Sequence, residues 1–142
     1  MGLIEALGYE IPTPNAAQRA MWHVSSSRPG ACVPVLTVTT TGARTGQPRS
    51  TPLLGVPFGS DIAIIGTRFG QPGTPGWYYN LRAQPRAEVA FRDRSVNATA
   101  READGDEWQQ IWAQARNIYA GYEAYASRIT NRKIRIMILS AS

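Results

Sequence analysis

The chain has 142 residues, of which 43% are hydrophobic and 18% charged, and this balance is typical of one soluble globular domain over residues 1–142. A single cysteine (Cys32) excludes an internal disulfide framework, and with a single histidine (His23) the ligands are too few for a zinc or haem cluster. The formal net charge of +5 suits an acidic ligand. We therefore expect no metal, and chemistry supplied by a bound cofactor or by carboxylates, tyrosines and arginines.

We expect the first 32 residues to be a helical segment, in which Asn15 can cap a helix that runs to about Ser26. Residues 1–14 lack the basic head and long apolar run of a signal or membrane segment, which predicts a cytoplasmic protein. Within the expected helix, apolar Ala20, Met21, Trp22 and Val24 alternate with polar residues, a pattern that allows weak peripheral contact with the inner face of the membrane. The arginines form no stripe with interleaved aromatic residues, so we expect no nucleic-acid partner.

Residues 33–67 read as three strands. Val33–Thr40 is apolar and β-branched, and Arg49–Phe58 is a second strand in which Pro52 indicates an edge or bulge position. Gly59-Ser60-Asp61 turns the chain into a third strand, Ile62–Thr67. A loop rich in glycine and proline follows, at residues 68–73.

The connection between the first two strands carries the strongest functional signal. Gly42 and Gly46 let the backbone turn its N–H groups inward as an anion nest, and Arg44 and Arg49 flank it with donors suited to phosphate or carboxylate. A polar hairpin loop with incidental arginines is the alternative, and the loop alone does not decide between them.

A helix over Pro75–Ala83 must end before Pro85 and begins with Thr74 as its cap. Its exposed N–H groups favour an anion, and Gly76 allows a ligand to approach the backbone. Trp77 offers a face for stacking, although it and Leu81 are better explained as anchors of the helix on the sheet. Asn80 can donate and accept hydrogen bonds toward a polar heterocycle.

The rest of the chain predicts a hairpin, a helix and a last strand. The hairpin spans residues 87–100 around Asp93-Arg94, and Asp104 with Glu107 resembles a capping arrangement before a helix with an apolar stripe. Ile134, Ile136 and Ile138 mark the last strand. About six strands in hairpins, with helices around them, indicate an α+β fold built on an antiparallel barrel.

Three tyrosines, Tyr119, Tyr122 and Tyr125, lie three residues apart before the last strand. Core packing explains Tyr125 well, but together the rings could form an aromatic wall over a planar ligand. One phenol could also donate a proton or a hydrogen bond to a reduced product.

In order and spacing, three segments resemble the deazaflavin-dependent nitroreductase family, whose members use coenzyme F420. They are Thr-Thr-Gly-Ala-Arg-Thr-Gly-Gln-Pro-Arg (40–49), Thr-Pro-Leu-Leu (51–54) and Gly-Trp-Tyr-Tyr-Asn-Leu-Arg-Ala-Gln-Pro (76–85). The resemblance implies a split β-barrel in which the turn holds the phosphate and glutamate tail of the deazaflavin. Ala43 stands where many relatives carry a basic residue, which implies a looser grip on that tail.

By this resemblance the cofactor-binding residues are Ala43, Arg44, Thr45, Arg49, Ser50, Thr51, Pro52, Leu53, Leu54, Ile65, Gly66, Thr67, Arg68, Gly76, Trp77, Tyr78, Tyr79, Asn80 and Tyr122. The catalytic residues, on the side of the electron acceptor, are Tyr119, Tyr122, Tyr125 and Thr67.

The implied activity is hydride transfer from carbon 5 of the reduced deazaflavin to an electron-poor small molecule such as a quinone, an activated alkene in a lactone or a nitro compound. A non-catalytic F420-binding protein and an FMN-binding split-barrel reductase are the alternatives. A monomer and a homodimer are both compatible with the sequence.

Overall fold

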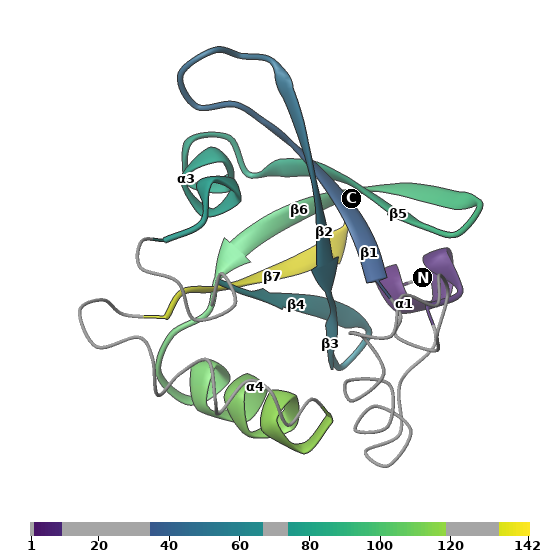
Figure 1. Cartoon of the computed structure of the whole chain (residues 1–142). Helices are drawn as coiled ribbons and strands as arrows, with labels where there is room; N and C mark the ends of the chain where they lie inside the picture. Colours follow the sequence, from purple (N-terminus) through teal and green to yellow (C-terminus); the bar gives the residue numbers. More distant parts are fainter. Residues whose placement is uncertain (1, 10–34, 67–73, 119–133) are drawn as a thin grey trace, which may run out of the picture.

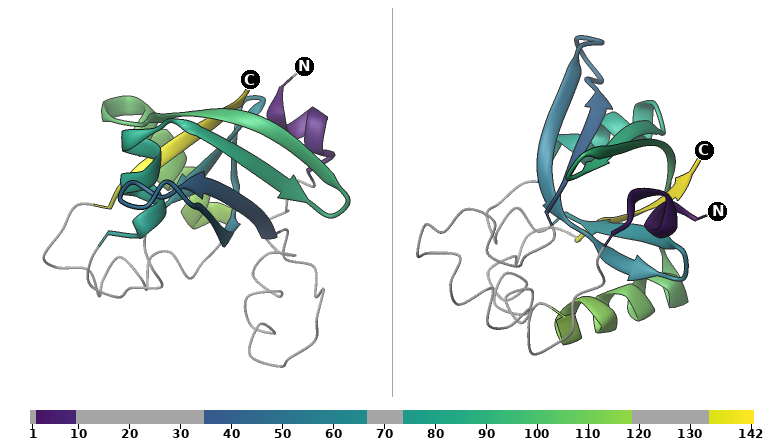
Figure 2. Two further views of the ribbon diagram at one scale, coloured as in Figure 1. Left: turned by 90° about the horizontal axis from the view of Figure 1, so that it is seen from above. Right: turned by 90° about the vertical axis from the view of Figure 1, so that its right-hand side faces the viewer.

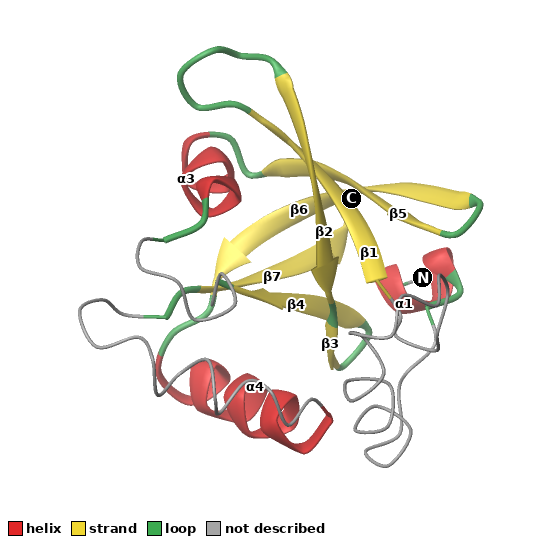
Figure 3. Ribbon diagram, in the orientation of Figure 1, coloured by secondary structure: helices red, strands yellow, loops and turns green. Residues whose placement is uncertain are grey.

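The computed structural model describes residues 2–9, 35–66, 74–118 and 134–142. These residues form one antiparallel sheet whose strands are β1 (Val35–Thr41), β2 (Pro48–Leu54), β3 (Val56–Phe58), β4 (Asp61–Ile65), β5 (Arg86–Phe91), β6 (Arg94–Glu102) and β7 (Ile136–Ala141). The spatial order is β2-β1-β5-β6-β7-β4-β3. Three helices accompany the sheet: α1 (Leu3–Leu7), α3 (Gly76–Ala83) and α4 (Gly105–Ile118) (Figures 1 and 3). The expected α+β class with an antiparallel split barrel is confirmed.

The sheet does not close into a complete barrel, and its two edge strands, β2 and β3, are connected at Gly55, a place called the split below. Strands β2 and β3 are separated by this one residue in the chain, yet they form the two opposite edges of the sheet. The sheet therefore curls until its edges approach one another, as Figure 2 shows. The single strand expected over Arg49–Phe58 is wrong in this respect, and the described residues hold seven strands where about six were expected. Pro52 does lie on an edge strand, β2, as its missing N–H predicts.

The amino-terminal helix α1 packs against the concave side of the sheet (Figure 2). Leu3, Ile4 and Leu7 are buried, and the helix ends at Gly8 in the left-handed conformation with φ 64°. Tyr9 then reaches the split: its hydroxyl donates to the Gly55 carbonyl at 2.9 Å and accepts from the Gly55 N–H at 3.2 Å. The sequence pattern does not predict α1. The helix expected from Asn15, with its proposed membrane contact, lies outside the described residues.

Two apolar clusters cover the two faces of the sheet. The larger one fills the concave side together with α1 and α3, and the smaller one lies between the sheet and α4. Strand β7 contributes to both, because Met137 and Leu139 belong to the first cluster and Ile136 and Ile138 to the second. The expected last strand thus begins at Ile136 and is buried on both faces. In the described residues, no helix is both long and apolar enough to cross a bilayer.

The helix starts differ from the expected ones in detail. Helix α3 begins at Gly76 with Pro75 as its cap residue, and no side chain caps it, so the role expected of Thr74 is wrong. At the start of α4, Glu107 does not complete a capping box. Its carboxylate instead accepts two hydrogen bonds from Arg101, at 2.6 and 2.9 Å. The hairpin of β5 and β6 turns at residues 92–93, one position earlier than expected.

Candidate cofactor-binding site

The connection between β1 and β2 is a defined turn that projects beyond the sheet (Figure 1). Gly42 N–H donates to the Gln47 carbonyl at 2.8 Å, and Gly46 N–H donates to the Gly42 carbonyl at 2.9 Å. Gly46 has a φ of 69°, a backbone conformation that residues with a side chain rarely adopt. A Cβ on Gly42 would lie 2.8 Å from the Thr45 hydroxyl oxygen. Gly46 is therefore required for its backbone conformation, and Gly42 is required because the turn has no room for a side chain at that position.

The open anion nest expected here is wrong for most of the turn. Besides the amides of Gly42 and Gly46, Gln47 N–H donates to the Thr45 hydroxyl at 3.2 Å and Ala43 N–H donates to the Asn80 side chain at 2.9 Å. Within the described residues, the amides of Arg44 and Thr45 are the two in the turn with no hydrogen-bond partner. Any anion bound at this turn would therefore meet only these two amides and the arginine side chains.

Arg44 in the turn and Arg49 at the start of β2 are both exposed, and neither forms an ion pair within the part of the chain that the structure describes. Arg49 lies directly opposite Thr40 in the β1–β2 ladder, so the two side chains share a face of the sheet. That face leads into the concave side, because Thr40 is only 2% exposed and its neighbours along β1 belong to the larger core cluster.

Strand β2 divides the predicted run Ser50–Leu54 between two faces, since successive side chains of a strand point in opposite directions. Thr51 and Leu53 share the face of Arg49, and Leu53 packs against the concave cluster. Ser50, Pro52 and Leu54 point the other way; the Ser50 hydroxyl lies 2.8 Å from that of Thr39, and Leu54 packs against the cluster under α4. A single ligand surface on this strand can therefore include only one of the two sets.

Asn80 connects the turn to α3. Its Oδ1 accepts from Ala43 N–H at 2.9 Å, and its Nδ2 donates to the Thr40 hydroxyl at 3.0 Å. Two predicted segments that lie more than thirty residues apart in the chain thereby meet. The amide group that was expected to contact a heterocycle is occupied by the protein itself.

The predicted segment at the end of β4 also meets the start of α3. Gly66 N–H donates to the Arg135 carbonyl at 2.8 Å, and a Cβ on Gly66 would lie 3.2 Å from both that oxygen and Pro75 Cδ. Gly66 therefore permits close packing of the end of β4 against Arg135 and Pro75. The adjacent Ile65 is buried in the cluster under α4. Thr67, Arg68, Tyr119, Tyr122 and Tyr125 lie outside the described residues, so their roles stay predictions.

The three aromatic residues of α3 differ in exposure. Trp77 and Tyr78 are 4% and 2% exposed and belong to the concave core, whereas Tyr79 is 52% exposed. The explanation of Trp77 as a core anchor is confirmed, and its ring offers little surface for stacking. Ala43 and Gly76 are exposed as well, and an added Cβ on Gly76 would meet no atom within 4 Å.

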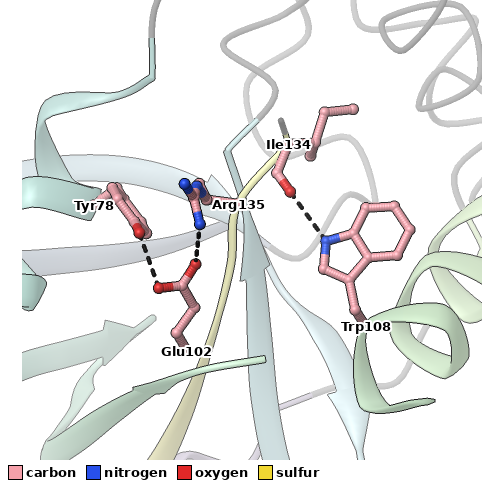
Figure 4. A network of polar contacts seen from close by, with 5 residues as sticks. All are labelled: Tyr78, Glu102, Trp108, Ile134 and Arg135. Carbon is pink, nitrogen blue, oxygen red and sulfur yellow. Dashed lines mark hydrogen bonds and ion pairs between the residues drawn. The ribbon is translucent and has the colours of Figure 1, made fainter. Parts of the chain in front are cut away.

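A polar network beside α3 was not predicted from the sequence (Figure 4). Tyr78 donates its hydroxyl hydrogen to Glu102 at 2.8 Å, and Arg135 Nη1 donates to the other carboxylate oxygen of Glu102 at 3.0 Å. The guanidinium of Arg135 also lies 5.5 Å from the centre of the Tyr78 ring. These residues come from α3, β6 and the entry to β7, and no local spacing in the sequence joins them.

The Tyr78 phenol gives a pH-dependent prediction. Burial raises the pKa of Tyr78 above its ordinary value of about 10, and the hydrogen bond to Glu102 raises this pKa further. Because the pKa is higher in the folded state, the stabilisation is complete below about pH 10 and is lost as the pH rises through the folded pKa. We expect urea titrations to show a fall in the free energy of unfolding in alkaline solution that is smaller in Tyr78→Phe. Equal pH dependence in the two proteins would contradict this role.

Comparison with known proteins identifies the family of the chain. The profile of the F420H(2)-dependent quinone reductase family matches residues 15–141. An F420H(2)-dependent quinone reductase of Mycobacterium tuberculosis (strain ATCC 25618 / H37Rv) is 35% identical over 106 residues, which cover 70% of each chain. Two solved structures are 34% identical with TM-scores of 0.67. One, an F420-H2 dependent reductase, is matched over 75% of this chain and 93% of its own. The other, a domain-swapped dimer, is matched over 75% and 79%. The resemblance noted in the sequence is thereby confirmed, and the chain belongs to the F420H(2)-dependent quinone reductase family.

Proposed function

We propose that this F420-dependent reductase transfers a hydride to a quinone. The family to which the chain belongs, and the quinone reductase that is 35% identical to it, support this choice of acceptor. Activated alkenes in lactones and nitro compounds are the other electron-poor acceptors that the same chemistry would allow.

The observation that supports coenzyme binding is a pair of exposed guanidiniums, Arg44 in the β1–β2 turn and Arg49 at the start of β2. Arg44 and Arg49 have no acidic partner within the described residues, and the turn beside them holds the two amides, those of Arg44 and Thr45, that have no hydrogen-bond partner there. Planar guanidinium donors match the geometry of phosphate and carboxylate groups, and the tail of coenzyme F420 carries both. We infer that these two side chains, with the amides of Arg44 and Thr45, hold that tail.

When bound, the reduced deazaflavin supplies the hydride, so the tasks of the protein are to bind, to orient and to exclude water. Gly76 leaves open space at the start of α3 through which a ligand can approach the backbone. We propose that Thr51 and Leu53 line the cofactor on the face of Arg49, and that Tyr79 offers an exposed ring beside it. Thr67, Tyr119, Tyr122 and Tyr125 are proposed to line the acceptor side, where water or a phenol donates the proton that the reduced product needs.

The test mixes the purified protein with the reduced coenzyme and one acceptor at a time: a quinone, a nitroaromatic compound or an unsaturated lactone. We expect the absorbance of the oxidised deazaflavin to recover fastest with the quinone. Faster recovery with another acceptor would replace the quinone. Tight binding of the coenzyme without oxidation by any acceptor would instead indicate a non-catalytic binder, and FMN in the denatured extract would indicate a flavin enzyme.

A further inference from the structure

We propose that Asn80 is a positioning residue, which holds the tail-binding turn in place without touching the coenzyme. This inference rests on the proposed function of the turn. It differs from the direct contact with a heterocycle that the sequence predicted for Asn80, because both ends of its side-chain amide already have partners in the protein.

The chemistry of the partners fixes the orientation of the amide. A backbone N–H can only donate, so the atom 2.9 Å from Ala43 N must be the carbonyl oxygen Oδ1. The amino group Nδ2 then faces the Thr40 hydroxyl at 3.0 Å, where it donates. Oδ1 and Nδ2 thus join two points of the hairpin, one in the turn and one in the strand that leads into it.

The two hydrogen bonds of the Asn80 side chain, to Ala43 and to Thr40, are called the Asn80 bracket below. Thr40 and helix α3, which carries Asn80, are both held firmly by the core. Thr40 is the one buried polar residue of the described chain, at 2% exposed. Helix α3 is fixed by Trp77, Tyr78 and Leu81, which are buried in the concave core. The turn itself is exposed from Ala43 to Gln47. Among the hydrogen bonds of the described residues, the Asn80 contact alone ties residues 42–47 to a part of the molecule outside the hairpin.

The contacts of Asn80 reduce the order that the turn must acquire when a ligand binds. A turn that is already held in the binding conformation loses less conformational freedom when an anion binds, and this difference appears as affinity. Ala43 immediately precedes Arg44, so the Asn80 contact acts on the backbone next to one of the two amides left for the ligand. Removal of the bracket should therefore weaken binding of the anionic tail and leave binding of the ring unchanged.

The experiment compares two ligands on each variant: intact coenzyme F420, and a deazaflavin nucleoside that lacks the phosphate and the glutamates. For Asn80→Ala we expect about tenfold weaker binding of the intact coenzyme and a change below about twofold for the nucleoside. Hydrogen exchange should also become faster at the Ala43 amide in the protein without ligand. Equal losses for the two ligands would mean that Asn80 contacts the ring, which would overturn the proposal.

Three further variants distinguish a local effect at the turn from a general loss of folding. Thr40→Val removes the hydroxyl that accepts from Asn80 and should reproduce part of the defect, whereas Thr40→Ser keeps a hydroxyl and should bind as the unmodified protein does. Tyr9→Phe removes a hydrogen-bonding hydroxyl at the Gly55 split and controls for general destabilisation. A defect in Tyr9→Phe as large as that in Asn80→Ala, or none in Thr40→Val, would overturn the proposal.

The Arg49→Ala variant separates a failure of the role inferred for Asn80 from a failure of the function proposed for the turn. If Arg49→Ala weakens binding of the intact coenzyme and Asn80→Ala does not, the bracket is irrelevant and the function proposed for the turn stands. If Arg49→Ala leaves the difference between the two ligands unchanged, the turn does not hold the tail, and the inference fails together with the proposal on which it rests.

Discussion

Replacement of Arg49 by alanine is expected to weaken binding of coenzyme F420 by about 1.5–3 kcal/mol, which corresponds to about tenfold to 150-fold in the dissociation constant. The guanidinium is exposed, has no ion-pair partner within the described residues and shares the face of Thr40 that leads into the concave side. Its loss should therefore remove a charge-assisted contact with the tail and leave the fold intact. Titration calorimetry with the intact coenzyme, at low and at high salt, measures the effect and its screening.

Arg94→Ala is the matched control, since it removes the same charge from an exposed position at the hairpin of β5 and β6. That hairpin lies at the opposite end of the sheet from the β1–β2 turn (Figure 1). If both variants weakened binding equally, the effect would reflect the net charge of the protein and not a contact. Arg49→Lys adds a second comparison: it keeps the charge but loses the planar pair of donors, so an intermediate affinity is expected.

Local chemistry in the sequence predicts most of the elements and the order of the site segments. Strand alternation and turn residues locate β1, β4, β5 and β6 closely, and the proline and glycine around α3 place that helix within one residue. The short helix α1 is missed because five residues give too little periodicity to recognise, although Leu3, Ile4 and Leu7 are all buried.

What the sequence does not predict depends on pairing between distant residues. Nothing in residues 49–58 shows that the chain passes from one edge of the sheet to the other at Gly55, because strand order follows from tertiary packing. The same is true of Asn80, whose amide is equally suited to a ligand or to a backbone N–H. Glu102 and Arg135 lie in different strand-end segments that meet only in the curled sheet.

The alanine variant of Gly55 is expected to lose about 2–3 kcal/mol of unfolding free energy, at the upper end of what overpacking a core costs. An added Cβ would lie 2.7 Å from Ile62 Cγ2, 2.9 Å from Leu36 Cδ1 and 3.0 Å from the Tyr9 hydroxyl oxygen. All three neighbours are buried, so they have little room to move away. Urea titration measures the loss. Gly76→Ala is the control for the same chemical change, because its Cβ would meet no atom and a helical alanine is neutral or stabilising.

A double-variant cycle with Tyr9→Phe tests whether the split is held by the tyrosine hydroxyl or by apolar packing. That hydroxyl bonds both backbone groups of Gly55, at 2.9 and 3.2 Å, and it is also one of the three atoms that an added Cβ would crowd. If the methyl group displaces the hydroxyl, Gly55→Ala already includes the cost of losing its hydrogen bonds. The double variant should then lose less stability than the sum of the two single variants. Strict additivity would mean that Ile62 and Leu36 absorb the methyl group and that the Tyr9 contact survives, so the two edges of the sheet would be joined mainly through the core.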